Sequence, residues 1–204
     1  MSLPLNVSYC TNCINALSKM PDESVDLVIT DPPYPNKMNF FSKSILDGYS
    51  ALFLCCKKSR NLVIFFWNAF NIPRPPEGWY EVARHVWHKP DCTSRTEYET
   101  ITVWSKNSKM LESKVWSIPI LEYKTLKEWQ PLPTQKPVQL IKNLIYLYSR
   151  PGNVILDPFL GTGTTAIACM QTNRRYIGYE NNFRNFYRLQ KRIKEEEKHE
   201  RSAR

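Results

Sequence analysis

One short segment combines an acidic side chain with two consecutive prolines and an aromatic ring. It reads Asp31-Pro32-Pro33-Tyr34 and directly follows the apolar run VDLVIT. The prolines restrict their own φ angles and the residue before them, so the Asp31 carboxylate and the bare carbonyl of Pro32 are expected to be rigid acceptors. Two such acceptors would localise the lone pair of an exocyclic base amine, and Tyr34 would offer a flat ring to a base withdrawn from its stack. The segment is predicted to be a catalytic loop, with an ordinary proline-rich turn as the alternative.

A second segment carries glycines in a spacing that suits a ligand-binding turn. It reads DPFLGTGTT, from Asp157 to Thr165, and follows the apolar run NVILD. Glycine allows close approach of the backbone to a ligand, and Thr164 or Thr165 would cap the helix that follows. Glu180 ends the next apolar run about 20 residues later, where an acidic residue binds ribose hydroxyls in dinucleotide-type sites. The third glycine of GxGxxG is missing and Glu180 alone could be a solvated strand end, but the pair predicts a nucleoside cofactor site.

The elements that must position these segments alternate between strand and helix. Strands are expected over residues 7–10, 25–30, 61–67, 81–87, 99–104, 153–157 and 175–179. Helices are expected over 13–20, about 40–57, 136–148, 164–171 and 182–197, with a fraying helix end or solvated tail over 191–204. Continuous apolar runs suit central strands covered on both faces, whereas YEVARHVW alternates and suits a half-exposed strand. The order predicts an α/β domain with a largely parallel sheet, whose carboxyl edge would carry both segments.

The composition of the chain bears on its binding partner, its location in the cell and its need for a metal. The 204 residues include 28 Lys and Arg against 19 Asp and Glu, a net charge of +9 that favours a polyanionic partner without requiring one. No apolar run reaches the ~20 residues needed to cross a bilayer and no signal-peptide pattern is seen, so a cytoplasmic protein with reduced thiols is expected. A zinc site is not favoured and no metal is expected, because the only candidate ligands lack a second CxxC pair: Cys10, Cys13, His85, His88 and Cys92.

Taken together and in this order, the segments resemble the amino-methyltransferases of DNA. The DPPY segment precedes FLGTGTT, and this permuted order is similar to the β group of that family, the DPPY-type N6-adenine methyltransferases. Three further segments match: VWHKP at 86–90, TEYETITVWSK at 96–106 and TQKP at 134–137. The resemblance implies a single domain over 1–204 with a circularly permuted, Rossmann-like S-adenosylmethionine-dependent fold, in which a seven-stranded, mostly parallel sheet has helices on both faces. A short insertion or reduced target-recognition region is expected at about 106–133.

The resemblance also implies roles for individual positions. Asp31, Pro32, Pro33 and Tyr34 would be catalytic. The implied S-adenosylmethionine contacts are Asn12, Cys13, Asp31, Thr134, Lys136, Pro137, Asp157, Phe159, Gly161, Gly163, Thr164 and Glu180. Asn12 departs from the family, which usually has an acidic residue there that contacts the cofactor adenine. An amide can keep that hydrogen bond, but the charge is lost.

The implied activity is site-specific transfer of a methyl group from S-adenosylmethionine to N6 of adenine in duplex DNA, with the target base flipped and no metal required. Adenine is favoured because cytosine-modifying relatives more often have Ser in place of Asp31. Few residues separate Lys106 from Thr134, whereas even small specific DNA modules bury roughly 600 Å². A short recognition sequence, a homodimer or a partner subunit is therefore expected.

Other functions stay open as alternatives to an N6-adenine DNA methyltransferase. They are an N4-cytosine DNA methyltransferase, an RNA or protein-amide methyltransferase, a non-catalytic DNA-binding subunit with an active partner, and a nicotinamide oxidoreductase, which Asp-Pro-Phe fits poorly.

Overall fold

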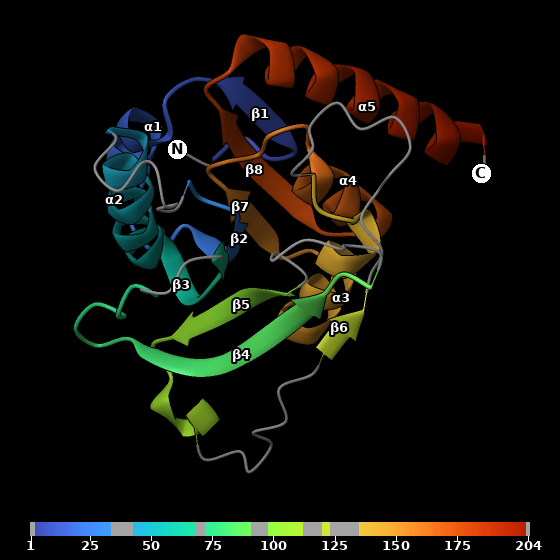
Figure 1. Cartoon of the computed structure of the whole chain (residues 1–204). Coiled ribbons are helices and arrows are strands. Elements are labelled where there is room, and N and C mark those ends of the chain that lie inside the picture. Colours follow the sequence, from blue (N-terminus) through green and yellow to red (C-terminus); the bar gives the residue numbers. More distant parts are fainter. Residues whose placement is uncertain are drawn as a thin grey trace.

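The computed structural model describes residues 3–33, 43–67, 72–90, 98–111, 120–122 and 135–202 (Figure 1). Its strands are β1 (Val7–Cys10), β2 (Val25–Thr30), β3 (Ser59–Trp67), β4 (Tyr80–His88), β5 (Tyr98–Ser105), β6 (Ile120–Glu122), β7 (Val154–Asp157) and β8 (Arg175–Glu180). Its helices are α1 (Cys13–Lys19), α2 (Lys43–Lys58), α3 (Val138–Tyr148), α4 (Thr164–Gln171) and α5 (Phe183–Ser202), with a short 3₁₀ turn η1 at Ser108–Leu111. None of the described helices is long and apolar enough to cross a bilayer.

The strands of the described residues form one sheet in the order β1-β8-β7-β2-β3-β5-β4-β6. The five strands from β1 to β3 pair in parallel, whereas β5 runs antiparallel to both β3 and β4. The predicted α/β fold with a mostly parallel sheet is confirmed, and each of the seven expected strands is present. The eighth strand, β6, lies within the expected insertion and pairs in parallel with the end of β4.

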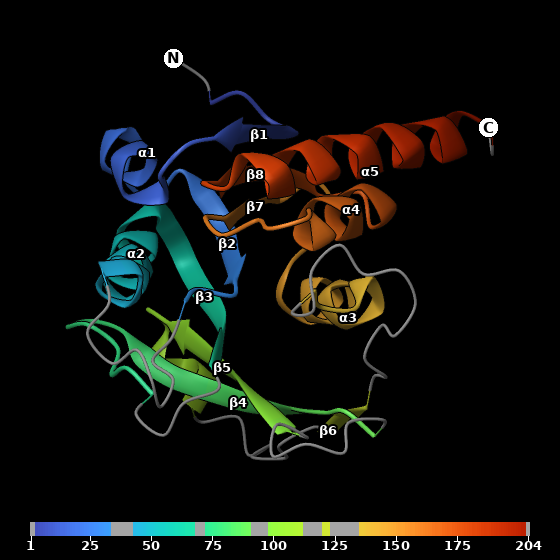
Figure 2. The same ribbon diagram turned by 45° about the horizontal axis from the view of Figure 1, so that its top comes forward.

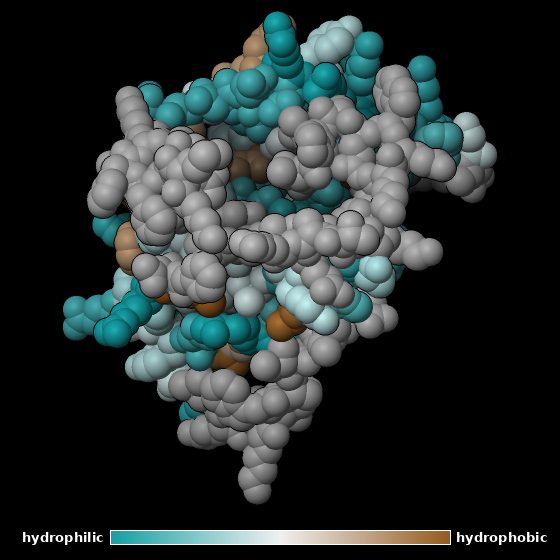
Figure 3. Space-filling model, viewed as in Figure 1, coloured by the Kyte–Doolittle hydropathy of each residue, from teal (hydrophilic) through white to brown (hydrophobic). Residues whose placement is uncertain are grey.

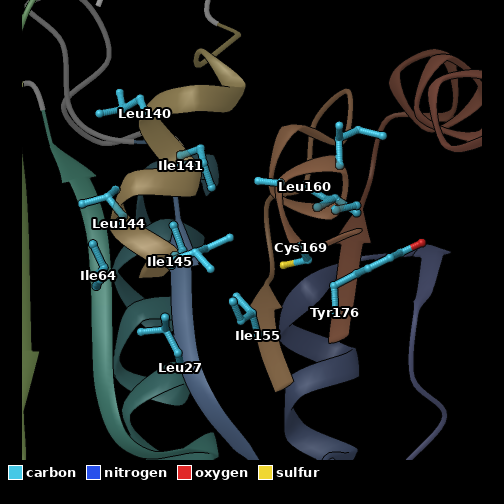
Figure 4. Close-up of a cluster of buried hydrophobic side chains, with 14 of the residues drawn as sticks. Leu27, Ile64, Leu140, Ile141, Leu144, Ile145, Ile155, Leu160, Cys169 and Tyr176 are labelled. Carbon is cyan, nitrogen blue, oxygen red and sulfur yellow. The ribbon is translucent and has the colours of Figure 1, made fainter. Parts of the chain in front are cut away.

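Helices cover both faces of the sheet. Figure 2 shows α1 and α2 on one face and α3, α4 and α5 on the other. Each face has its own apolar core: Leu17 and Leu52 lie in the first, and Leu144 and Leu189 in the second. Figure 4 shows the second core between α3 and the central strands, with Leu27, Ile64, Leu140, Ile141, Leu144, Ile145 and Ile155 labelled. Burial on both faces explains why the central strands read as continuous apolar runs.

The crossover connections diverge between β2 and β7. The chain passes from β2 through α2 to β3 on one side, and from β7 through α4 to β8 on the other. The register pairs Leu27 with Ile155 and Val28 with Leu156, so both strands end at the same edge of the sheet. Open α/β sheets bind ligands outside the carboxyl ends of the strands at such a switch point. The loops after β2 and β7 therefore meet there.

The start of one helix and the cap of another differ from the prediction. Helix α3 begins at Val138 rather than at Lys136, because Pro137 is an extended N-cap and disfavours a helical conformation for the residue before it. Helix α4 is preceded by Gly163 in a left-handed conformation with no side-chain cap, so the expected capping by Thr164 or Thr165 is wrong. The first difference leaves Lys136 in an extended segment, where its side chain can reach the loop after β2.

Helix α5 is longer than expected. The Asn182 side chain accepts hydrogen bonds from the backbone of Arg184 (2.9 Å) and Asn185 (3.2 Å), which fixes the first turn. The helix then continues to Ser202, so most of the segment expected to fray is helical. Leu189 and Ile193 are buried against the sheet. The surface over α5, along the upper edge of Figure 3, is largely hydrophilic, as one exposed face of an amphipathic helix should be.

Candidate active site

A cavity of about 570 Å³ lies where the loops after β2 and β7 meet. The expected site residues that line it are Asp31, Pro32, Pro33, Lys136, Asp157, Phe159, Gly161, Thr164 and Glu180. They come from the ends of three parallel strands and from the segment that leads into α3. The structure thus brings the predicted catalytic loop and the predicted cofactor loop to one cavity.

The two carboxylate oxygens of Asp31 have different surroundings. Oδ2 lies 2.5 Å from the ammonium of Lys136. Oδ1 is buried and has no hydrogen-bond partner among the described residues. A buried acceptor without a partner is costly, and such an atom in a cavity suits a ligand that brings its own donor. Oδ1 of Asp31 is therefore suited to accept a hydrogen bond from an amino group of a ligand.

Lys136 also contacts a second carboxylate. Its ammonium lies 3.2 Å from Oε1 of Glu99, whose other oxygen, Oε2, lies 3.1 Å from the ammonium of Lys89. Burial lowers the pKa of Lys136, but Asp31 and Glu99 more than offset it, so the pKa is raised and the side chain stays protonated at neutral pH. Burial raises the pKa of Asp31, while the Lys136 ammonium opposes that shift. These charges form one compact cluster behind the cavity.

Asp157 connects the two loops. Its Oδ1 accepts hydrogen bonds from the Thr30 hydroxyl and the Phe159 backbone, both at 3.0 Å, and its Oδ2 accepts one from the Thr165 hydroxyl at 2.6 Å. Burial raises the pKa of this carboxyl to about 6. Both of its oxygens are therefore already bonded within the protein, and Asp157 fixes the start of the glycine loop against the end of β2.

The two glycines of the second loop have different neighbours. Gly161 lines the cavity and has a φ of 56°, which favours glycine. Gly163, with a φ of 89°, is not among the lining residues, and a Cβ there would lie 3.0 Å from Leu189 of α5. The absence of a side chain at Gly163 thus permits close packing of α5, whereas Gly161 leaves room at the cavity wall.

Glu180 lies at the far side of the cavity, at the end of β8. Its carboxylate accepts hydrogen bonds from the backbone of Gly161 and Asn182, the latter at 2.6 Å. Burial raises its pKa. The backbone of Asn181 and the side chain of Asn185 also act as donors to this carboxylate, so a ribose hydroxyl in the cavity would share it with protein donors.

Several expected residues lie elsewhere. The Asn12 side chain is the N-cap of α1 and accepts hydrogen bonds from the backbone of Ile14 (2.9 Å) and Asn15 (3.4 Å). Cys13 is buried in α1 and Pro137 is the buried N-cap of α3, and none of these three lines the cavity. Tyr34 and Thr134 lie outside the described residues. Their roles toward a ligand stay predictions.

Residues without an expected role also shape the site. The Thr162 hydroxyl donates to Oε1 of Gln135 at 2.6 Å, which joins the glycine loop to the segment before α3. Glu99 and Lys89 form the charge cluster described above. Both lie in segments that match the DNA amino-methyltransferases, and a Glu directly before the apolar run TITVW was the available signal. Only the pairing of β4 with β5, which sets Trp87 opposite Glu99, shows that the two charges meet.

Comparison with known proteins identifies the family. The family model described as DNA methylase, which covers N6 and N4 enzymes, matches residues 36–191. The chain belongs to this DNA methylase family. The resemblance predicted from the DPPY and FLGTGTT segments is therefore confirmed at the level of the family, and the β group stays a prediction.

Individual relatives agree with that assignment. The type II methyltransferase M.HpaI of Haemophilus parainfluenzae is 26% identical over 218 residues, covering 85% of this chain and 69% of the relative. The DNA adenine methyltransferase YhdJ of Escherichia coli (strain K12) is 38% identical over 76 residues, 37% of this chain and 26% of the relative. The crystal structure of the M1.HpyAVI–SAM complex has a TM-score of 0.68 and 22% identity, covering 91% of this chain and 98% of that one. It shows that this DNA methylase shares the fold.

Proposed function

We propose that this DNA methylase transfers a methyl group from S-adenosylmethionine to the N6 amino group of adenine in duplex DNA. The observation that carries the proposal is Oδ1 of Asp31, a buried acceptor without a hydrogen-bond partner among the described residues, on a side chain that lines the same cavity as Gly161 and Glu180. Such a cavity can receive a nucleoside-containing methyl donor and an amino group together. Membership of the DNA methylase family supports the reaction class.

The residues around the glycine loop fit S-adenosylmethionine, which M1.HpyAVI binds in its crystal structure. Gly161 leaves the cavity wall open, Glu180 offers a carboxylate to the ribose hydroxyls, and Phe159 supplies an apolar surface. When bound, S-adenosylmethionine supplies an electrophilic methyl group on its sulfonium. The cavity residues hold and orient it, and Asp157 keeps the loop in place.

The loop after β2 fits the base. Oδ1 of Asp31 and the carbonyl of Pro32 would accept hydrogen bonds from the two N–H groups of the amine, which localises its lone pair on nitrogen. Tyr34 is proposed to stack on the flipped base. Positioning of two reactants is a large part of catalysis in such transfers, and a loop with two consecutive prolines is suited to it.

Two observations favour adenine over cytosine. The loop begins with Asp31, as expected for the N6-adenine enzymes, and the relative YhdJ is named a DNA adenine methyltransferase. The family itself covers both base amines. We further propose that residues 106–133 form a reduced recognition region in a single domain, completed by a second copy of the chain or by a partner subunit.

The test is methyl transfer to DNA. Purified protein incubated with labelled S-adenosylmethionine and an unmodified duplex should label the DNA, and digestion followed by mass spectrometry should show N6-methyladenine. A matched duplex that carries purine, which lacks the amino group, in place of adenine should not be labelled. N4-methylcytosine would overturn the base assignment. Cofactor binding without transfer to any duplex would instead favour a non-catalytic subunit.

A further inference from the structure

A chain of alternating charges extends from the cavity into the sheet. Starting at Asp31, it passes to Lys136 at 2.5 Å, then to Glu99 at 3.2 Å and finally to Lys89 at 3.1 Å. The four residues come from the ends of β2 and β4, from β5 and from the segment before α3. The far members are well buried, since the Glu99 side chain is 3% exposed and that of Lys89 10%. Two positive and two negative charges cancel within the chain.

The surroundings offer the ammonium groups of Lys136 and Lys89 few other hydrogen-bond acceptors. The Lys136 ammonium lies over the ring of Phe66 at 4.9 Å, and the Lys89 ammonium lies over the ring of Trp87 at 4.6 Å. Aromatic faces attract cations but give no fixed hydrogen-bond direction. The carboxylate of Glu99 is the one charged group of the described residues that forms an ion pair with both ammonium groups, while Lys136 also donates a hydrogen bond to Asp31.

Lys136 needs such an anchor. It lies in the extended segment before α3, and its long side chain has several rotatable bonds. Glu99, in contrast, lies on β5, where the ladder with β4 pairs it with Trp87. A rigid strand thus fixes the position of a flexible cation, and that cation binds Oδ2 of Asp31.

We propose that Glu99, anchored by Lys89, is a positioning residue for Asp31: it holds the Lys136 ammonium on Oδ2 and so leaves Oδ1 as the free acceptor in the cavity. The proposal rests on the proposed function for its catalytic consequence. Its electrostatic consequence concerns Asp31 alone and holds without any ligand. Glu99 contacts no reacting atom in this arrangement and acts through Lys136.

The charges around Asp31 allow the proposal to be tested through the pKa of the Asp31 carboxyl. Asp31 is faced by Lys136 from the segment before α3, Glu99 from β5, Lys89 from β4 and Asp157 from β7. Glu99 raises the pKa of Asp31, whereas Lys89 lowers it. If Glu99 holds Lys136 on Oδ2, removing Glu99 also frees the Lys136 ammonium, which affects the pKa of Asp31 more strongly than Glu99 does, so the pKa should rise.

The experiment compares Glu99→Gln and Lys89→Gln with the wild type, both without and with cofactor. A carbon-13 NMR titration of the Asp31 carboxyl in the cofactor-free protein should show a higher pKa in Glu99→Gln, because Lys136 is no longer held on Oδ2, and a higher pKa in Lys89→Gln, because a neighbouring positive charge is lost. With cofactor and DNA, Glu99→Gln should lower kcat about 10-fold or more, as loss of a group that orients a catalytic residue does. Its cofactor Kd should change less than about twofold, a difference well under ~1 kcal/mol.

Glu81→Gln is the matched control. Glu81 is a carboxylate on β4 that lies 2.6 Å from the guanidinium of Arg84 and does not line the cavity. This variant should match the wild type in the Asp31 titration and in kcat. Thermal melts and cofactor binding establish that each variant is folded. An unmoved or lowered pKa of Asp31 in Glu99→Gln would overturn the inference, because it would show that Lys136 stays on Oδ2 without Glu99. Inactive wild-type protein with a raised pKa in Glu99→Gln would overturn only the proposed function, because the titration needs no methyl transfer.

Discussion

Asp31 and Asp157 look alike in the sequence, since each follows a buried strand and precedes proline, yet their carboxylates have different surroundings. Asp31 has one oxygen on Lys136 and one without a protein partner among the described residues. Asp157 accepts three hydrogen bonds from the protein. The free oxygen is available for chemistry, whereas the bonded carboxylate holds the cofactor loop. Neighbouring side chains, rather than the local sequence, make this difference.

Asp157 should make stability depend on pH. Burial raises its pKa from 3.8 to about 6, so the folded protein binds a proton more tightly than the unfolded chain does. Stability from this group is therefore present at low pH and lost as the pH rises through about 6, by up to about 3 kcal/mol. Asp157→Asn, which cannot ionise, should remove that component.

Urea unfolding at a series of pH values from 4 to 7 measures this effect. The free energy of unfolding of the wild type minus that of Asp157→Asn should fall as the pH rises. Asp22→Asn is a suitable control, because Lys58 lowers the pKa of Asp22 below its usual 3.8, so this variant should leave the difference nearly flat between pH 4 and 7. A difference that rises with pH for Asp157→Asn would contradict the assignment.

Helix α2 approaches the catalytic loop at Gly48. A Cβ at this position would lie 2.3 Å from the backbone oxygen of Pro33, so the loop or the helix would have to shift. Gly48→Ala should therefore displace the loop and lower kcat by about 10- to 100-fold, as a misplacement of about 1 Å can. In an ordinary helix interior the same change would stabilise by about 0.5–1 kcal/mol.

Steady-state methyl transfer and thermal melts together test this contact. Ser50→Ala, an exposed change in the same helix, should leave kcat unchanged. If Gly48→Ala were as active as the wild type and more stable, the close approach of α2 to Pro33 would not hold.

Strands that are buried on both faces could be predicted almost to the residue, as β2 and β7 show, because their apolar runs are continuous. Boundaries set by caps could not. The start of α3 depends on Pro137, and α5 continues beyond its apolar residues. Strand β6 has three residues and depends on its pairing with β4, which no local pattern indicates.

The candidate site was predictable in its loops but not in its charge cluster. Asp31, Gly161 and Glu180 lie directly after buried strands, and parallel strands bring their ends to one edge. Glu99 and Lys89 reach the site across an antiparallel hairpin, so their meeting with Lys136 depends on tertiary packing. Asn12 caps α1, and its expected contact with the cofactor stays a prediction.

At the scale of the whole molecule, the sheet makes one site from two distant loops. β2 and β7 lie far apart in the chain but side by side in the sheet, and their crossovers diverge. The order of the catalytic and cofactor segments along the chain therefore does not matter for where they meet. The arrangement separates a part that holds the cofactor, with Gly161 and Glu180, from a part that holds the base, with Asp31 and Pro32.

This separation is tested most directly by Asp31→Ala, assayed in parallel for S-adenosylmethionine binding by calorimetry and for single-turnover methyl transfer to duplex DNA. Lys136 keeps Glu99 as its partner in this variant, so the cavity should persist. We expect transfer to fall by about 100-fold or more, as for loss of a group that acts directly on the reacting amine. Cofactor Kd should stay within about threefold of the wild type, less than ~1 kcal/mol. Substantial transfer by Asp31→Ala would contradict the assignment of Asp31 as the acceptor that orients the base.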